Sequence, residues 1–329
     1  MSHMIDVTTG TPAIAYAGET PWHGIGRRLT PGLSIEEWTR EAGLAYDVLS
    51  TPVEFRAGGS LRTFSDLTVL YRSDTGRPLS VVSNRYNPVQ PREVMDYFRE
   101  LTEIGGFTLE TAGAIADGKR IWALAKVHDG APVTGHDVVK PYALLATSYD
   151  GTLATTAKLT TIRIVCWNTL SASVGYYDGQ KFQRGEDDAG SPVVKVPHRQ
   201  RFDAKSVRKQ LGIYRDAFEK MLIEFELLAK REIDLVHAQN LTARLIKPLV
   251  AKDVEPRETA MFARIIDLFD GASIGNDLAG PTTWGWLNSV TQYVDWERGR
   301  DSTRLNSAWF GPGDNIKTRA HELALEDIA

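Results

Sequence analysis

SYDGTLATTAKLTTIRIVCWNTLSASV, the segment from Ser148 to Val174, combines the signals of a turn, a strand and the start of a helix. Its Asp-Gly pair favours the tight turn of a β-hairpin. The residues after the pair are rich in threonine and other β-branched side chains, which are typical of strands. We therefore predict a hairpin with strands at 138–149 and 152–165. The run from Arg163 to Leu170 then leads into a predicted helix.

Four polar side chains of this segment lie among Ile, Val and Trp: Lys158, Arg163, Asn168 and Thr169. Burying such groups without a partner costs free energy, and buried polar groups are nearly always hydrogen-bonded. These side chains are therefore either satisfied inside the protein or face a bound ligand.

Hairpins flanked by helices are also predicted before this segment. Ser34 and Glu37 form a capping-box pattern, which indicates a short helix up to Ala42. Alternating and β-branched runs predict strands at 46–55, 61–72, 79–84, 107–116 and 120–127. Apolar residues at helical spacing predict a further helix at 91–104.

The sequence pattern changes near residue 178. Residues 178–198 are polar and contain several glycines and prolines, which is typical of an exposed loop or linker. From Asp203 to Leu228, apolar residues recur every three or four positions and predict a long amphipathic helix. Shorter helices are expected at 241–250, 256–269, 282–295 and 314–325. The predicted fold class is α+β: a domain at 1–177, built of antiparallel hairpins with flanking helices, precedes an all-helical region at 199–329.

The composition is that of an ordinary globular protein, with 329 residues, 42% hydrophobic and 24% charged. No segment reaches the roughly eighteen apolar residues that a membrane-spanning helix needs, so no membrane partner is expected. The single cysteine fits a reducing cytoplasm. A net charge of −4 gives no overall attraction to nucleic acid, so a site for a polyanion must be a local patch.

The best binding candidate is the stretch from Lys195 to Lys209, in which Asp203 is the one acid among six basic residues. Lys205, Arg208 and Lys209 fall on one face of the expected helix, roughly opposite its apolar stripe. This arrangement suits a helix that meets phosphates on one side and packs on the other; an ordinary solvated face is the alternative. Phosphate contacts are expected from Lys158, Arg163, Arg199, Arg201, Lys205, Arg208 and Lys209.

Single-stranded nucleic acid is commonly held by aromatic stacking beside a basic groove. We expect Tyr149 or Trp167 to supply such a stack. The alternative for most aromatic side chains in this region is a place in the core.

No metal site or catalytic centre stands out. One cysteine and widely spaced histidines do not match a structural zinc site, so no metal and no cofactor are expected. Cys166 is interpreted as a buried structural thiol. An enzymatic alternative would bring His23, Asp150 and Asn168 together in a pocket that acts on a nucleotide or nucleic acid.

Seven motifs are distinctive in combination: Pro21–Gly26, Tyr86–Gln90, Thr111–Gly113, Gly118–Ala123, Asp150-Gly151, Arg163–Leu170 and Asn288–Asp295. Together they resemble the phage and plasmid protein family known as domain of unknown function 932. The family pattern often has His before the Asp-Gly pair and Gln before the Asn-Thr-Leu run, where this chain has Tyr149 and Trp167. The resemblance implies a mobile-element protein in a bacterial host, and it supplies no known reaction.

From these observations we expect a nucleic-acid-binding protein of phage or plasmid DNA metabolism, with single-stranded DNA as the favoured partner. Single-strand binding or annealing in recombination is suggested by fold-level analogy. The alternatives are the enzyme described above and a protein that binds a host factor. The long amphipathic helix also favours a homo-oligomer.

Overall fold

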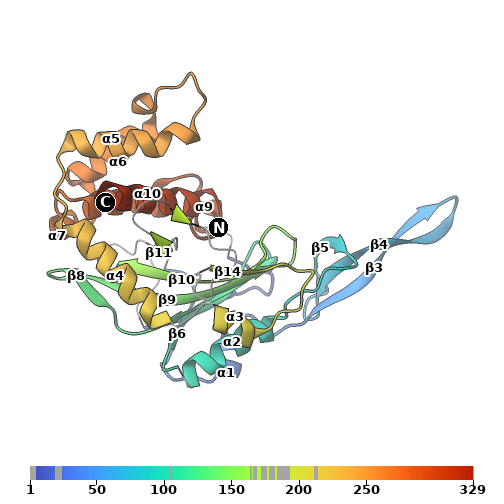
Figure 1. Ribbon diagram of the computed structural model, residues 1–329. Helices are drawn as coiled ribbons and strands as arrows, with labels where there is room; N and C mark the ends of the chain where they lie inside the picture. The colour runs from blue at the N-terminus through green and yellow to red at the C-terminus, as the bar shows by residue number, and fades with distance from the viewer. Residues whose placement is uncertain are drawn as a thin grey trace. The chain divides into compact units, whose positions relative to one another are not determined.

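The computed structural model (Figure 1) describes residues 5–18, 24–103, 105–163, 165, 169–171, 176–177, 182–183, 193–210 and 214–328. Antiparallel sheets with flanking helices are followed by a helical C-terminal region, which confirms the predicted α+β class. Within these residues, no helix has both the length and the apolar character needed to cross a membrane.

The protein forms two compact units that are interleaved along the sequence. Unit 1 comprises Met1–Val127, Ala143–Lys158 and Val193–Leu211, and unit 2 comprises His128–Tyr142, Leu159–Pro192 and Gly212–Ala329. This division differs from the contiguous domains expected from the sequence. Composition marks where polarity changes along the chain, whereas the units are set by contacts between residues far apart in sequence.

Within the described residues, the largest sheet has nine strands in the order β11-β10-β9-β7-β6-β1-β2, with β14 also paired to β10 and β8 to β9. Its strands are β1 (Ile14–Ala17), β2 (Arg27–Leu29), β6 (Thr108–Ile115), β7 (Arg120–Lys126), β8 (Ala131–Thr134), β9 (Asp137–Ser148), β10 (Thr155–Arg163), β11 (Thr169–Ser171) and β14 (Val193–Val196). A three-stranded sheet contains β3 (Val48–Ala57), β4 (Ser60–Arg72) and β5 (Pro78–Ser83), and β12 (Tyr176–Tyr177) pairs with β13 (Phe182–Gln183).

Two predicted hairpins are confirmed, because β6 pairs antiparallel with β7 and β4 with β5. β3 also pairs antiparallel with β4, and β9 and β10, the strands of the third predicted hairpin, are neighbours in the largest sheet. The β6–β7 turn needs Gly118, whose φ of +81° is left-handed and whose added Cβ would lie 2.8 Å from Nη1 of Arg72. Arg72 is buried and pairs with the carboxylates of Asp6 and Asp74, so it cannot move aside easily.

Among the described residues, unit 1 contains the helices α1 (Ile35–Glu41), α2 (Pro91–Glu103) and α3 (Ala204–Gln210). The capping box is present at α1, because Ser34 Oγ accepts from the Glu37 amide while the Glu37 carboxylate accepts from the Ser34 amide. The face of α2 that carries Val94 and Phe98 is buried, as its helical spacing predicts.

Unit 2 is built mainly of helices. They are α4 (Tyr214–Lys230), α5 (Leu235–Ile246), α6 (Ala260–Asp267), α7 (Asn276–Ala279), α8 (Thr283–Gln292), α9 (Asp301–Phe310) and α10 (Pro312–Ile328), with short 3₁₀ or π turns at Lys247–Leu249, Pro256–Glu258, Leu268–Ala272 and Tyr293–Glu297. Every residue of α8 is buried. Phe225 of α4 packs on Trp284 with ring centroids 4.7 Å apart, so α4 and α8 share one core.

Two sequence-based expectations need correction. The run after Arg163 is not the start of a helix at Thr169–Ser171, because these residues form β11 and pair antiparallel with 160–162 of β10. Residues 193–196, which the polar loop was expected to include, form β14 and pair with β10. In both cases pairing with β10, which directly precedes β11 and lies further from β14 in sequence, outweighs local composition. The long helix predicted from Asp203 corresponds to α3 and α4, with 211–213 outside the described residues.

Candidate nucleic-acid interface

The basic segment, residues 195–209, is formed by the end of β14, a turn and α3. Five of its cationic side chains are exposed: Lys195, Arg199, Arg201, Lys205 and Lys209. Within the part of the chain that the structure describes, none of these five forms an ion pair. The side chain of Arg208 lies outside the described residues. Cations that are not neutralised by neighbouring carboxylates remain available to a polyanion.

Apolar contacts hold α3 so that its basic residues face outward. The side chain of Val207 is buried, and the ring of Phe202 lies 6.4 Å from that of Tyr97 on α2. Oδ1 of Asp203 accepts a hydrogen bond from the backbone amide of Lys205 at 3.1 Å, so the one acid of the segment caps the helix. The segment is therefore both anchored and locally cationic.

The turn before α3 is tied to the loop at 86–87. The Asn87 amide donates to the His198 carbonyl at 2.7 Å, and Asn87 Nδ2 donates to the Arg199 carbonyl at 3.3 Å. The rings of Tyr86 and His198 are stacked with centroids 4.4 Å apart. Burial lowers the pKa of His198 below 6.5, so this side chain is mainly neutral at pH 7. The positive charge of the turn comes from its arginines.

Tyr149 is not available as a stacking partner, because its side chain is completely buried in unit 1. Its hydroxyl donates to the Val89 carbonyl at 3.0 Å, and burial raises its pKa, which keeps the donor protonated. Next to Val89, the Gln90 side chain accepts from the Val48 amide at 2.8 Å and donates to the Val48 carbonyl at 3.1 Å. The Tyr86–Gln90 motif thus ties together parts of unit 1.

Two of the expected phosphate contacts are also buried. Lys158 lies in β10 opposite Val193 of β14, with its side chain 3% exposed. In unit 2, Arg163 is 2% exposed and makes two hydrogen bonds to Asp137, at 2.7 and 2.8 Å. Arg163 also donates to the carbonyls of Ile274 and Gly275. Neither cation can reach a phosphate without leaving the core, which corrects both expectations.

The partner of Arg163 was missed by the sequence analysis. Asp137 is fully buried, and its Oδ2 also accepts from Nε1 of Trp284 at 2.8 Å. Gly275 has a left-handed φ of +71°, and a Cβ added there would lie 2.6 Å from Cγ1 of Val165 and 3.2 Å from Nη1 of Arg163, so this position requires glycine. The sequence could indicate only that an arginine, if buried, needs a carboxylate partner. It could not identify Asp137 as that partner.

The pocket of His23, Asp150 and Asn168 that an enzyme would need can be described only at Asp150. His23 and Asn168, like Trp167 and Cys166, lie outside the described residues. The Asp150 carboxylate accepts from the amide of Thr152 at 3.0 Å and from its hydroxyl, so it stabilises its own turn. Burial alone would raise the pKa of Asp150, but the hydrogen bonds from Thr152 and the charge of Arg120 hold that pKa below its ordinary value.

A contact between the buried His321 and the half-buried Glu224 in unit 2 also went unnoticed in the sequence. Nε2 of His321 lies 3.4 Å from Oε2 of Glu224. Burial lowers the pKa of His321 to about 4 and raises that of Glu224 to about 7, the latter opposed by Lys220. Across the described residues, no group of three or more His, Cys, Asp or Glu side chains has the arrangement of a metal site.

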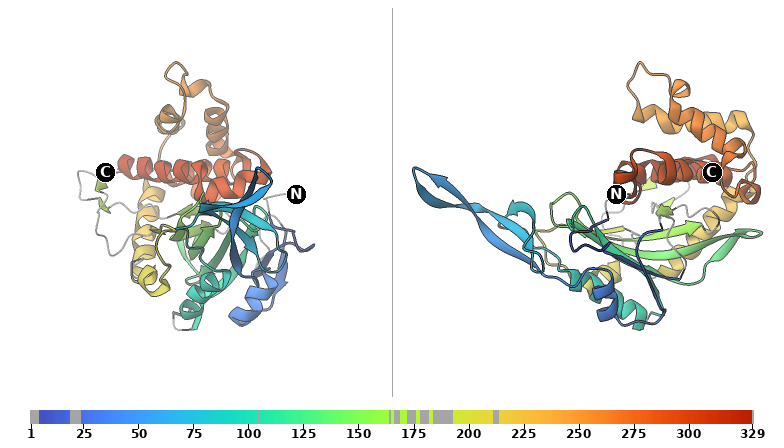
Figure 2. Two further views of the ribbon diagram at one scale, coloured as in Figure 1. Left: turned by 90° about the vertical axis from the view of Figure 1, so that its right-hand side faces the viewer. Right: turned by 180° about the vertical axis from the view of Figure 1, so that it is seen from behind.

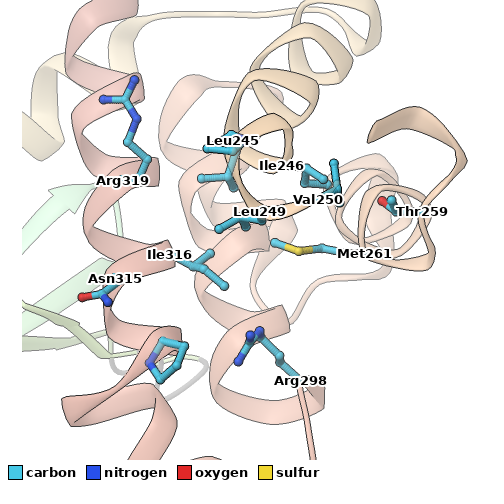
Figure 3. Close-up of a pocket in the computed structure, with 12 residues that line it drawn as sticks. Leu245, Ile246, Leu249, Val250, Thr259, Met261, Arg298, Asn315, Ile316 and Arg319 are labelled. Atoms are coloured by element: carbon cyan, nitrogen blue, oxygen red, sulfur yellow. The ribbon is translucent and has the colours of Figure 1, made fainter. Parts of the chain in front are cut away.

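A cavity of about 350 Å³ in unit 2 lies between the end of α5, the start of α6 and the start of α10 (Figure 3). Apolar side chains such as Leu245, Met261 and Ile316 line most of it, with Arg298 and Arg319 at its edge. Its walls suit a small apolar group rather than a phosphate chain. The cavity therefore lacks the lining expected of a phosphate-binding site.

The comparisons with known proteins identify the family. Residues 78–322 match the family described as Domain of unknown function (DUF932). The match covers more than half of the chain, so the protein belongs to this family, as its motifs suggested. No curated protein and no solved structure matches the chain. The family description names no activity, so the function has to be argued from the site.

Proposed function

We propose that the protein binds single-stranded nucleic acid, with DNA favoured, through its basic segment. The observation that carries the proposal is the set of five exposed cations on residues 195–209 that have no carboxylate partner among the described residues. Neutralising phosphates with such cations releases condensed counterions, which provides sequence-independent affinity even for a protein with net negative charge.

The setting of such a protein would be phage or plasmid DNA metabolism, in the cytoplasm of a bacterial host. Within that setting, single-strand binding or annealing in recombination is the role that the site chemistry fits. Tyr86, half-buried and stacked on His198 in the turn of the basic segment, replaces Tyr149 as the proposed stacking residue.

The test is the salt dependence of binding, measured by fluorescence anisotropy with a labelled oligothymidylate of about 30 nucleotides, long enough for one site. If about five phosphates are contacted at ~0.7 released ions each, log affinity should fall against log salt with a slope of about −3.5. Absence of binding at about 50 mM salt would refute the proposal. Hydrolysis or release of the label during the assay would favour the enzymatic alternative.

A pair of charge reversals locates the site. Lys205→Glu together with Lys209→Glu should reduce the magnitude of the slope by about 1.4, since two contacts are lost. Lys247→Glu with Lys252→Glu is the matched control: both side chains are exposed in unit 2, and the net charge changes equally. Equal losses in the two variants would indicate a general charge effect and argue against the basic segment.

A further inference from the structure

The β3–β4 hairpin extends beyond the third strand of its sheet. Pairing of β4 with β5 begins at Leu67, whereas residues from Val53 to Phe64 pair only across the hairpin. Figures 1 and 2 show the end of this hairpin projecting past β5 as a two-stranded ribbon. We call residues 53–64 the arm. A two-stranded ribbon is marginally stable by itself in water, so a partner that covers it would stabilise it.

The arm exposes large apolar side chains. Phe55 is 45% exposed, Leu61 60% and Phe64 46%. Directly opposite residues of an antiparallel pair share a face, and the register places Val53 opposite Phe64 and Phe55 opposite Arg62. One face of the arm therefore combines Val53, Phe55 and Phe64 with Arg62, and Leu61 lies on the other face opposite Arg56.

The charge of the arm does not suit nucleic acid. Its charged residues are Glu54, Arg56 and Arg62, so its net charge is a single positive one spread over the whole arm. The basic segment has six cations against one acid. A phosphate backbone would favour the second surface, whereas a mixed-charge apolar ribbon suits a protein partner.

The outer edge of β3 offers backbone groups for pairing, since β3 is one of the two edge strands of its sheet within the described residues. Two copies of one edge strand related by a two-fold axis pair antiparallel, and the axis passes beside one residue that faces its own copy. With Phe55 at the axis, Glu54 faces Arg56 of the partner subunit and Arg56 faces the partner's Glu54. An axis at Glu54 or at Arg56 would instead oppose like charges, which is destabilising.

We propose that the arm is a homodimerisation element in which β3 residues 53–57 pair antiparallel with the same residues of a second copy, with Phe55 at the two-fold axis. This inference is independent of nucleic-acid binding. The bulge between Pro52 and Val53 limits the paired length at one end, and the turn after Ala57 limits it at the other. Proline lacks an amide hydrogen and therefore cannot extend the ladder.

The short paired length sets the strength of the dimer. An interface formed by one five-residue strand and its neighbouring side chains stays below the ~1,200 Å² of a standard stable interface. Self-association should therefore be concentration-dependent, with a dissociation constant roughly in the micromolar range or weaker.

Sedimentation velocity of the full chain over a concentration series tests the proposal. The wild type should shift towards dimer as concentration rises. Glu54→Arg or Arg56→Glu alone places like charges across the axis and should weaken the dimer about tenfold or more, by analogy with other cross-strand and interface charges. The double variant Glu54→Arg/Arg56→Glu exchanges the two charges and should restore it, while Lys252→Glu, an exposed reversal elsewhere, should have no effect.

A cysteine at the axis gives a second readout that does not depend on affinity. In a Cys166→Ser background, Phe55→Cys should form an intersubunit disulfide under mild oxidation, because directly opposite residues lie within disulfide range. Thr63→Cys, on the inner strand of the arm, should not. A monomer at all concentrations without a disulfide at position 55 would overturn the proposal, as would a dimer that the charge swap fails to restore.

Discussion

The buried pair of Arg163 and Asp137 gives a quantitative test of the structural role assigned to Arg163. The two side chains are 2% and 0% exposed and share two hydrogen bonds. Breaking such a pair from one side leaves an uncompensated buried charge, at a cost of about 3–5 kcal/mol. We expect this loss of unfolding free energy for Asp137→Asn, which keeps the shape of the side chain, and for Arg163→Met.

The double variant measures the interaction between the two side chains separately from their interactions with the rest of the protein. Asp137→Asn/Arg163→Met removes both charges, so its loss should be smaller than the sum of the single losses by about 2–3 kcal/mol, near the upper end of measured coupling energies. The exposed pair Arg77–Asp117, with side chains 48% and 57% exposed, is the matched control and should show a coupling below about 1 kcal/mol.

Urea denaturation followed by far-ultraviolet circular dichroism measures all of these free energies. Additive single losses at Asp137 and Arg163, or a loss below about 1 kcal/mol for Asp137→Asn, would refute the buried-pair interpretation. The folded double variant should also retain wild-type affinity for single-stranded DNA, because the charge of Arg163 is not available to phosphate. A large loss of affinity would return Arg163 to the candidate interface.

Three further outcomes are expected. Gly118→Ala should lower the unfolding free energy by about 1–3 kcal/mol in urea, since its backbone is left-handed and the new Cβ would meet Arg72. Chelators should change neither the circular dichroism spectrum nor DNA affinity, and a stoichiometric metal in elemental analysis would contradict this. The folded pKa of His321, about 4, lies below its ordinary value of 6.5. The unfolding free energy of the protein should therefore be unaffected by this group above pH 6.5 and should fall as the pH drops from 6.5 towards 4. By pH 5 this loss of unfolding free energy relative to pH above 6.5 is about 2 kcal/mol, and His321→Gln should abolish that part of the pH dependence. Glu224, whose pKa is raised to about 7, acts in the opposite sense, since its stabilising protonated form is lost as pH rises from 4.5 through 7.

Much of the fold follows from local sequence signals. The capping box at Ser34 and the buried face of α2 depend on residues three or four apart, and the hairpins depend on turns between adjacent strands. The predictions that failed concern pairing that local composition does not reveal. β11 is a strand because it pairs with the preceding strand β10, β14 pairs with β10 across a longer stretch of sequence, and the division into units follows contacts that composition does not encode.

The same difference between local signals and tertiary contacts explains which residues of the candidate site were predicted correctly. The basic character of α3 is local, because Lys205 and Lys209 lie one helical turn apart, and the structure leaves both exposed. Arg163 is buried because it pairs with Asp137, 26 residues earlier in the sequence. Asp137 in turn accepts a hydrogen bond from Trp284, 147 residues later. No spacing rule identifies such partners.

Burial therefore divides the basic residues into two groups with different uses. Moving Arg163 to the surface to meet a phosphate would first require breaking its pair with Asp137 and leaving that carboxylate buried, at about 3–5 kcal/mol. A single phosphate contact in water does not offset such a loss, since one exposed ion pair contributes about 1 kcal/mol or less. Lys205 and Lys209 bear no comparable cost, because their charges are already solvated and have no carboxylate partner among the described residues. If this chain binds a polyanion, the affinity should thus depend on the basic segment, and Arg163 should affect it only through the stability of unit 2.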